Sequence, residues 1–440
     1  MSKNTLALGV LSVKSEYPVL AAAKYTEVRW VIKLSYSTNG LVNLSLMDAI
    51  DAVEKAGYPG IELAFHMEQF NPFEMSEDDL LALRQRFANS NIKPSCIATP
   101  TLFFLADRPH DPSAMCVDLA GRKQRIKLIK EGIKLARALD VKIVSFGSGF
   151  IRDDHVANPQ VDPEALLIDS IRECVAFIGD DDIVLTIEPE PGMFIETIAQ
   201  GVALIEKVNL DKFRLHIDIC HAYCSDQNYV DAIAGAAHLT KYLHVSDTTA
   251  GYNLKILHYE DGLTLDFDFA SYLLYFPDTA DFLLLERNRA AYFYDQTPNR
   301  EQIQAIAGRL NEAPEVVFVP FDQLPQESSS YDDEIFTYAL SVPKLSFYVL
   351  DRAKPIIHYL RQQDRRDQGL PYMDKMVANS LTGKVHFHII PGEGEIDFAG
   401  CFKAAVDNGF DGYATVELYH HIDGWEQAVN TSYQQLSKCL

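Results

Sequence analysis

The stretch IVLTIEPEPG, residues 183–192, is an apolar run of strand length that is followed by acidic residues, prolines and a glycine. Seven further apolar runs of similar length occur along the chain: VIKLSYS (31–37), GIELAFH (60–66), PSCIATP (94–100), VKIVSFG (141–147), FRLHID (213–218), YLHVSD (242–247) and YATVEL (413–418). Near-continuous apolar runs of this length indicate strands that are covered on both faces of a sheet. Stretches with apolar residues at helical spacing separate most of them: 44–58, 76–87, 121–140, 162–179 and 196–208.

Alternating strands and helices predict an α/β fold, and eight such strands predict a (β/α)₈ TIM barrel. An open, doubly wound sheet is the alternative. Such a sheet normally carries a glycine-rich phosphate loop after its first strand, but the segment YSTNGLVNLS (36–45) contains no such motif. The barrel is therefore the favoured fold.

The spacing of the runs predicts a large insertion in the last βα unit, because the run at 242–247 is followed by the last run only at residue 413. We assign residues 31–249 and 390–440 to the barrel, 250–389 to an inserted subdomain and 1–30 to an N-terminal extension. The insertion has its own strand patterns, at 281–288, 315–321 and 345–351, and helix patterns, at 300–310 and 353–369. We expect it to cap the C-terminal face of the barrel, where active sites of this architecture lie. A peripheral elaboration is the alternative.

The composition disfavours several classes of protein. The 39 basic and 62 acidic residues give a net charge of −23, which opposes binding to nucleic acid or to an anionic membrane. No apolar run approaches the roughly 18 residues that span a bilayer, and the N-terminal segment lacks the basic region of a signal peptide. The seven cysteines are scattered and odd in number, which is typical of reduced thiols in a cytoplasmic protein. We therefore expect a cytoplasmic protein.

Acidic residues and a histidine stand at or near the ends of four consecutive predicted strands: Glu188, Asp218, His244 and Glu417. In a barrel these strand ends meet at one mouth, so the side chains form a set of three carboxylates and one imidazole. Such a set suits a divalent ion such as Mn²⁺, Zn²⁺ or Mg²⁺. Burying three carboxylates without a cation is unfavourable through repulsion and desolvation. The alternative is that each acid caps a helix or pairs with an arginine.

Several of these strand ends resemble the motifs of the xylose-isomerase-like TIM barrels, a superfamily of sugar and sugar-phosphate isomerases, epimerases and endonuclease-IV-type enzymes. The segments that carry the resemblance are IEPEPG (187–192), HIDICHA (216–222) and YLHVSD (242–247). PGEGEID (391–397) and GFDGYATVELY (409–419) are similar to the C-terminal signature of the superfamily. The resemblance covers residues 31–250 and 385–440 and leaves the insertion unexplained.

The resemblance implies that Glu188, Asp218, His244 and Glu417 hold one divalent ion, Mn²⁺ or Zn²⁺ in the first place, with Mg²⁺ and Co²⁺ as alternatives. It also implies substrate contacts by His66 and His221, and a supporting or substrate-binding role for Asp247. Further candidates for substrate binding come from the residues themselves: Glu190, which competes with Glu188 as the metal-binding glutamate, Arg152 as the one candidate for a phosphate, and His388. By alternation, His386 and His388 lie on one face, where they line the mouth or replace His244 as a metal ligand.

This constellation predicts an isomerase or epimerase of a sugar, sugar phosphate or polyol ketone. Glu188 and Glu417 act as the acid/base pair, and a metal-stabilised enediolate forms. The alternatives are a lyase or dehydratase on the same site, including one that cleaves carbon glycosides, and a non-catalytic sugar-binding barrel. An endonuclease-IV-like nuclease is disfavoured, because PSCIATP (94–100) and IVSFGSG (143–149) supply no histidine. We expect a small carbohydrate or polyol as partner, no nucleic acid, no membrane, and a surface compatible with homo-oligomers.

Overall fold

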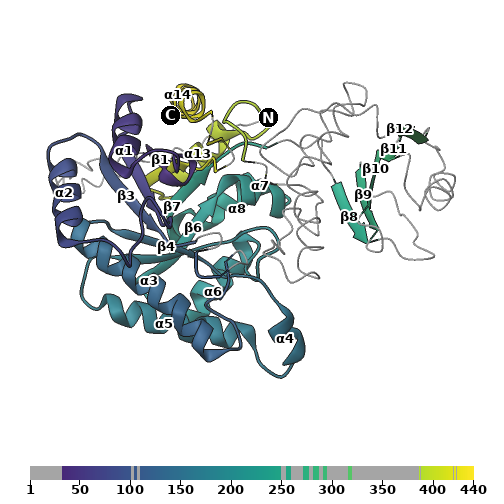
Figure 1. The fold of residues 1–440 in the computed structure, drawn as a ribbon, viewed down its shortest axis with the longest axis horizontal. Helices are drawn as coiled ribbons and strands as arrows, with labels where there is room; N and C mark the ends of the chain where they lie inside the picture. Colours follow the sequence, from purple (N-terminus) through teal and green to yellow (C-terminus); the bar gives the residue numbers. More distant parts are fainter. Residues whose placement is uncertain are drawn as a thin grey trace, which may run out of the picture.

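The computed structural model describes residues 32–100, 104–106, 110–248, 386, 388–419, 421–422 and 424–440, together with the backbone of five strands between residues 254 and 319. Eight parallel strands close a barrel in the order β1-β13-β7-β6-β5-β4-β3-β2, which confirms the predicted (β/α)₈ fold (Figure 1). The strands of the barrel are β1 (Ile32–Ser37), β2 (Gly60–Ala64), β3 (Lys93–Ala98), β4 (Ile143–Gly147), β5 (Val184–Glu188), β6 (Phe213–Asp218), β7 (Thr240–Val245) and β13 (Gly412–Val416).

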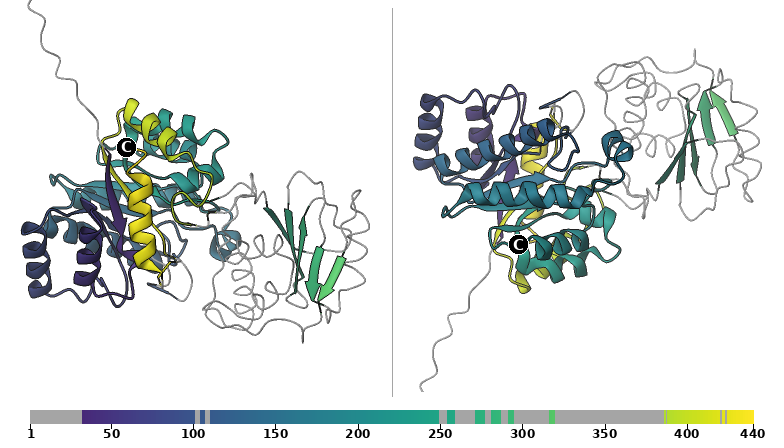
Figure 2. Two further views of the ribbon diagram at one scale, coloured as in Figure 1. Left: turned by 90° about the horizontal axis from the view of Figure 1, so that it is seen from above. Right: turned by 90° about the horizontal axis from the view of Figure 1, so that it is seen from below.

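Helices connect the barrel strands and cover them from outside (Figure 1). Their bounds are α1 (Leu46–Lys55), α2 (Glu77–Ala88), α3 (Leu119–Leu139), α4 (Asp153–Ala157), α5 (Pro163–Ile178), α6 (Ile198–Val208), α7 (Ile219–Ser225), α8 (Tyr229–Ala236), α13 (Phe398–Asp407) and α14 (Trp425–Leu436), with short 3₁₀ turns η1 (Thr38–Gly40) and η2 (Ala237–Leu239). The last helix, α14, packs beside β1, so the end of the chain closes against the first barrel strand (Figure 2).

Several helices begin at residues whose side chains cap the helix N-terminus. α2 begins with a capping box: the Ser76 hydroxyl accepts the N–H of Asp79, and the Asp79 carboxylate accepts the N–H of Ser76. α7, which was not predicted, begins directly at the end of β6. Its N-cap is Asp218, whose Oδ1 accepts the N–H groups of Cys220 (2.6 Å) and His221 (3.1 Å). None of the helices that the structure describes is both long and apolar enough to cross a membrane.

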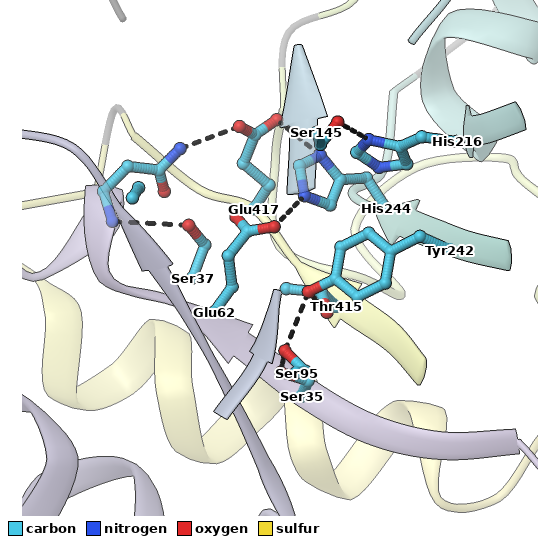
Figure 3. Close-up of polar contacts among 12 residues, drawn as sticks. Ser35, Ser37, Glu62, Ser95, Ser145, His216, Tyr242, His244, Thr415 and Glu417 are labelled. Carbon is cyan, nitrogen blue, oxygen red and sulfur yellow. Dashed lines mark hydrogen bonds and ion pairs between the residues drawn. The ribbon is translucent and has the colours of Figure 1, made fainter. Parts of the chain in front are cut away.

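The parallel register places the strand ends of the predicted site side by side. β5, β6, β7 and β13 are consecutive neighbours in the barrel, and Asp218 on β6 pairs directly with His244 on β7. Below this level the barrel interior is polar around Tyr242, whose hydroxyl accepts the Thr415 hydroxyl (2.6 Å) and hydrogen-bonds the Ser95 hydroxyl (2.8 Å) (Figure 3). The site therefore stands on a hydrogen-bonded layer and not on a purely apolar core.

A second sheet belongs to the predicted insertion, between β7 and β13 in the chain. Its strands are β8 (Leu254–His258), β9 (Ser271–Phe276), β10 (Asp281–Glu286), β11 (Ala291–Tyr294) and β12 (Val316–Val319), in the order β12-β11-β10-β9-β8. β10 and β12 fall within the predicted strands 281–288 and 315–321. The predicted strand at 345–351, the helices at 300–310 and 353–369 and the extension 1–30 lie outside the described residues. The cap over the barrel mouth stays a prediction.

Candidate metal centre

The structure brings the four strand-end residues together. Glu188 is the last residue of β5, Asp218 the last of β6, His244 the fifth of β7, and Glu417 follows β13 directly. One ligand atom from each of the four lies within 4.8 Å of those of the other three. We call Glu188, Asp218, His244 and Glu417 the carboxylate site. Parallel strands of a closed barrel end at one rim, which is why residues as far apart in sequence as these converge.

His244 is the centre of the carboxylate site. Its Nδ1 lies 3.2 Å from Oε1 of Glu188 and 3.4 Å from Oε2 of Glu417. Its Nε2, on the other side of the ring, lies 3.0 Å from Oε2 of Glu62 (Figure 3). A buried imidazole whose Nε2–H donates to a carboxylate turns its Nδ1 toward Glu188 and Glu417, where that nitrogen can hold either a proton or a cation.

Three contacts of this site were not predicted as functional: Glu62, Asn39 and His216. Glu62 is fully buried in the middle of β2, and a lone carboxylate in an otherwise apolar strand was the signal available for it. Asn39 follows β1, and its Nδ2 donates to Oε1 of Glu417 at 2.7 Å. His216, which lies inside β6, faces the barrel interior. Its Nδ1 hydrogen-bonds the Ser145 hydroxyl at 2.7 Å (Figure 3). The same Nδ1 lies 3.6 Å from Oε2 of Glu188.

Burial sets the electrostatics of the carboxylate site. It raises the pKa of Glu188 to about 8, against the lowering effect of His244, and it raises the pKa of Asp218 as well. For Glu417 burial acts in the same direction, but His244, His388 and His221 together outweigh it and lower the pKa. For His244 burial favours the neutral ring, yet Glu62, Glu417 and Glu188 raise its pKa well above the ordinary value. Burial thus makes Glu188 and Asp218 hard to ionise unless a positive charge lies beside them.

The donor set fits a divalent cation. Oδ1 of Asp218 is used by the start of α7, whereas its buried Oδ2 has no hydrogen-bond partner among the described residues. Burying a carboxylate oxygen without a hydrogen-bond donor is unfavourable unless a cation binds that oxygen. Together with one oxygen each from Glu188 and Glu417 and the Nδ1 of His244, it makes the three-oxygen, one-nitrogen set that was predicted.

Three histidines form a second group beside the carboxylate site, and we call His221, His386 and His388 the histidine cluster. Nε2 of His388 lies 3.2 Å from Nε2 of His221 and 3.1 Å from Nδ1 of His386, and all three rings are buried. The cluster touches the first site, since Nδ1 of His388 lies 3.5 Å from Oε2 of Glu417. His386 and His388 thus gather with His221, and the four-residue group retains His244.

The remaining predicted substrate contacts have varied surroundings. His66 is half-buried after β2, and its Nδ1 accepts the N–H groups of Glu68 and Gln69, both at 3.3 Å. Arg152 is buried, and its Nε lies 3.7 Å from Oδ1 of Asp111. Its guanidinium lies over the Phe150 ring. Glu190 is partly buried. Burial and the charge of Glu417 raise the pKa of the Tyr419 phenol well above its usual value, and Glu190 contributes to the same shift.

Asp247 shapes the loop that precedes α13. Its carboxylate accepts the N–H groups of Thr248 and Gly392 (each 2.9 Å), of Gly394 (2.9 Å) and of Ile396 (3.1 Å). Its backbone forms an isolated bridge with Ile389, in which each residue donates to the other. The PGEGEID segment is therefore folded around one carboxylate, which anchors the chain just after His388.

Comparison with known proteins agrees with this architecture. The model of the family "Xylose isomerase-like TIM barrel" matches residues 50–312. Similar solved structures include a D-tagatose 3-epimerase-like protein (11% identity, TM-score 0.52, 92% of this chain and 99% of that one) and the IOLI protein with a binding zinc atom (15%, 0.50, 93% and 96%). A third similar structure is a xylose isomerase domain protein from Alicyclobacillus acidocaldarius subsp. acidocaldarius. It has 11% sequence identity and a TM-score of 0.50, and the match covers 93% of this chain and 98% of that one.

At these identities the likeness to solved structures shows the fold, and no match was found among curated proteins. The family match extends over more than half of the chain, and the closed eight-stranded barrel agrees with it. The chain belongs to the xylose isomerase-like TIM barrel family.

Proposed function

We propose that this protein is a divalent-metal-dependent isomerase or epimerase of a sugar, sugar phosphate or related polyol ketone. The observation that carries the proposal is the placement of Glu188 and Glu417 around Nδ1 of His244, at 3.2 and 3.4 Å, with Asp218 in the same group. Two carboxylates that face one small space from different strands can reach a substrate carbon from two directions. That is what moving a proton between two faces, or between neighbouring carbons, requires.

Glu188, Asp218, His244 and Glu417 would hold the ion. When bound, a divalent ion supplies Lewis-acid polarisation of a carbonyl and so acidifies the neighbouring C–H group. One of the two glutamates then removes that proton, and the C–H electron pair moves toward the carbonyl. The other glutamate, or the same one, returns a proton to the opposite face or to the neighbouring carbon, so that the product has the mass of the substrate.

Neighbouring side chains support the two glutamates in these roles. Asn39 donates to Oε1 of Glu417 (2.7 Å), which leaves Oε2 facing His244. Glu62 holds His244 from the opposite side of its ring (3.0 Å). Burial removes water from the site, which strengthens these electrostatic interactions.

Solvent exchange tests the proposal directly. The full-length protein, loaded with Mn²⁺ or Co²⁺, is incubated in D₂O with a panel of ketoses, their phosphates and inosose-type ketones. We expect deuterium to enter one substrate at the carbon beside the carbonyl, with loss of exchange in EDTA and recovery on metal addition. Glu188→Gln and Glu417→Gln should each lower the rate by about 10²- to 10⁴-fold, whereas Glu426→Gln, an exposed glutamate on α14, should not.

Product mass separates the proposal from a lyase. A dehydratase on the same site would release one water per turnover, and carbon-glycoside cleavage would split the substrate. Unchanged mass with incorporated deuterium supports isomerisation or epimerisation. Full turnover by Glu417→Gln would overturn the proposal.

A further inference from the structure

Two buried arginines lie near each other beside the barrel strands, outside the carboxylate site. Arg125 is in the second turn of α3 and is 4% exposed, and Arg152, which joins β4 to α4, is 8% exposed. A positive charge in the interior is disfavoured by burial and disfavoured further by a second positive charge beside it. The pair therefore needs a physical reason, and its surroundings supply one.

Arg125 is held by neutral groups. Its Nε donates to the carbonyl oxygen of Pro112 (2.8 Å) and its Nη1 to that of Thr99 (3.4 Å). Its Nη2, a nitrogen with two N–H groups, has no hydrogen-bond partner in the described part of the chain. Burial is the main cause that lowers the pKa of Arg125 to about 10; Arg152 acts in the same direction, and Asp111 opposes both. A buried guanidinium of this kind is unfavourable unless an anion accepts from it.

Close packing of two loops brings the arginines together. Pro112, whose carbonyl oxygen accepts from Arg125, is followed by Ser113. Ser113 packs against Gly149, in the loop that leads from β4 to Arg152. Gly149 takes φ = 85°, and a Cβ at this position would lie 2.3 Å from the Cβ of Ser113. Glycine satisfies both requirements, so the loop after β4 can lie directly against the segment that Arg125 holds.

The arginines are on the same rim of the barrel as the carboxylate site. β3, β4 and β5 are consecutive neighbours, and Gly147, the last residue of β4, pairs with Glu188, the last residue of β5. Arg152 follows β4 on this side of the barrel. Thr99, whose carbonyl oxygen accepts from Arg125, directly follows β3. The two guanidinium groups therefore belong to the strand ends beside the one that carries Glu188.

We propose that Arg125 and Arg152 together bind an oxyanion group of the substrate, and that this group is a phosphate monoester. A phosphate monoester carries a charge of about −1.5 to −2 near pH 7 and several acceptor oxygens, which suits two guanidinium groups better than a single carboxylate does. The net charge of −23 repels such a substrate at long range, so its binding needs a local cationic site. The inference rests on the proposed function for the reaction and narrows its substrate to a ketose phosphate.

Binding of orthophosphate to the full-length, metal-free protein tests the inference without turnover. Calorimetric titration follows dialysis against a buffer that contains no chelator, with acetate as the carboxylate probe. We expect orthophosphate to bind about 10- to 100-fold more weakly to Arg125→Gln and to Arg152→Gln than to the wild type, because each loses a charged hydrogen bond. Arg172→Gln, which changes an exposed arginine on α5, is the matched control and should bind as the wild type does. Acetate that binds more tightly than orthophosphate at the same two arginines would support the oxyanion site and assign it to a carboxylate.

Equal binding of orthophosphate by the wild type and Arg152→Gln, or no binding by the wild type, would overturn the inference. Circular dichroism shows whether each variant is folded, and Arg152→Gln decides if Arg125→Gln is not.

Paired substrates separate the inference from the proposed function. In the exchange assay, Arg152→Gln should raise KM for a ketose phosphate about 10- to 100-fold more than KM for the same ketose without phosphate. An equal loss with both substrates would show a structural role for Arg152 and overturn the inference, while the isomerase proposal stands. Orthophosphate binding that depends on both arginines, in a protein that exchanges no substrate proton, would contradict the proposed function and support the anion site.

Discussion

Oε2 of Glu62 lies 3.0 Å from Nε2 of His244, on the side of the ring opposite Glu188 and Glu417. Both residues are buried, and Glu62 stands inside β2, far in sequence from the four strand ends. The carboxylate fixes the ring so that Nε2 carries a hydrogen and Nδ1 faces the carboxylate site. Glu62 is therefore a positioning residue that acts through His244.

Removing this carboxylate should weaken metal binding. Glu62→Gln keeps the shape of the side chain and an oxygen that accepts from Nε2–H, but it loses the charge; Glu62→Leu loses both. We expect metal affinity to fall by about 10-fold in Glu62→Gln and by up to about 100-fold in Glu62→Leu. Competition with a chelating dye measures both. Equal affinity in the wild type and Glu62→Leu would contradict the role given to Glu62.

Asn39 should affect the turnover rate, because its hydrogen bond orients the Glu417 carboxylate. Asn39→Ala removes the hydrogen bond of 2.7 Å to Oε1, and Glu417 then becomes free to turn away from His244. A hydrogen bond to a charged group contributes about 1.5–3 kcal/mol, so we expect kcat to fall by about 10- to 100-fold with a smaller change in KM. Asn430→Ala, at an exposed position on α14, is the control. A change confined to KM would show that Asn39 binds substrate instead.

Asp218 should couple metal binding to stability. Asp218→Asn keeps a good N-cap for α7, because asparagine caps helices as well as aspartate does, and it removes one of the crowded charges. In EDTA we expect the variant to melt at the same temperature as the wild type or higher. Mn²⁺ should raise the melting temperature of the wild type through preferential binding to the folded state, and raise that of Asp218→Asn little. Scanning fluorimetry with and without metal checks both; an equal rise in the two proteins would argue against Asp218 as a ligand.

Asp226, at the end of α7, should make stability depend on pH. Burial raises its pKa from 3.8 to about 6; the N–H of Ile198 opposes this and Glu196 adds to it. The folded state therefore binds this proton more tightly than the unfolded state, so the contribution of Asp226 to stability falls as pH rises from about 4 through about 6. Asp226→Asn does not titrate. Its melting temperature relative to the wild type should increase over this range and then stay level, and a difference that is constant with pH would contradict the assignment.

The carboxylate site could be predicted because it follows a rule of topology. Residues at the carboxyl ends of parallel barrel strands meet at one rim. Correct strand boundaries were therefore enough to predict that Glu188, Asp218 and Glu417 lie together. Glu62 and His216 lie within strands, and only the closed barrel shows that their side chains reach the site from inside.

The histidine cluster could be predicted from the sequence only in part. His386 and His388 were predicted to share a face, where they line the mouth or replace His244 as a metal ligand. Their partner His221 is on a helix that the apolar periodicity did not predict. α7 has seven residues, all buried, so it shows no polar face from which a helix could be predicted. The orientations of the His221 and His388 rings depend on hydrogen bonds to the carbonyls of Pro189 and Glu417, which no sequence pattern identifies.

Anomalous diffraction from a crystal grown with Mn²⁺ tests the central claim most directly. At the manganese edge we expect a peak bonded to Glu188, Asp218, His244 and Glu417, at about 2.0–2.2 Å from each ligand atom, as is usual for a small divalent ion. Anomalous density that lies elsewhere, or Glu188 and Glu417 too far apart to share one ion, would contradict the account of this site.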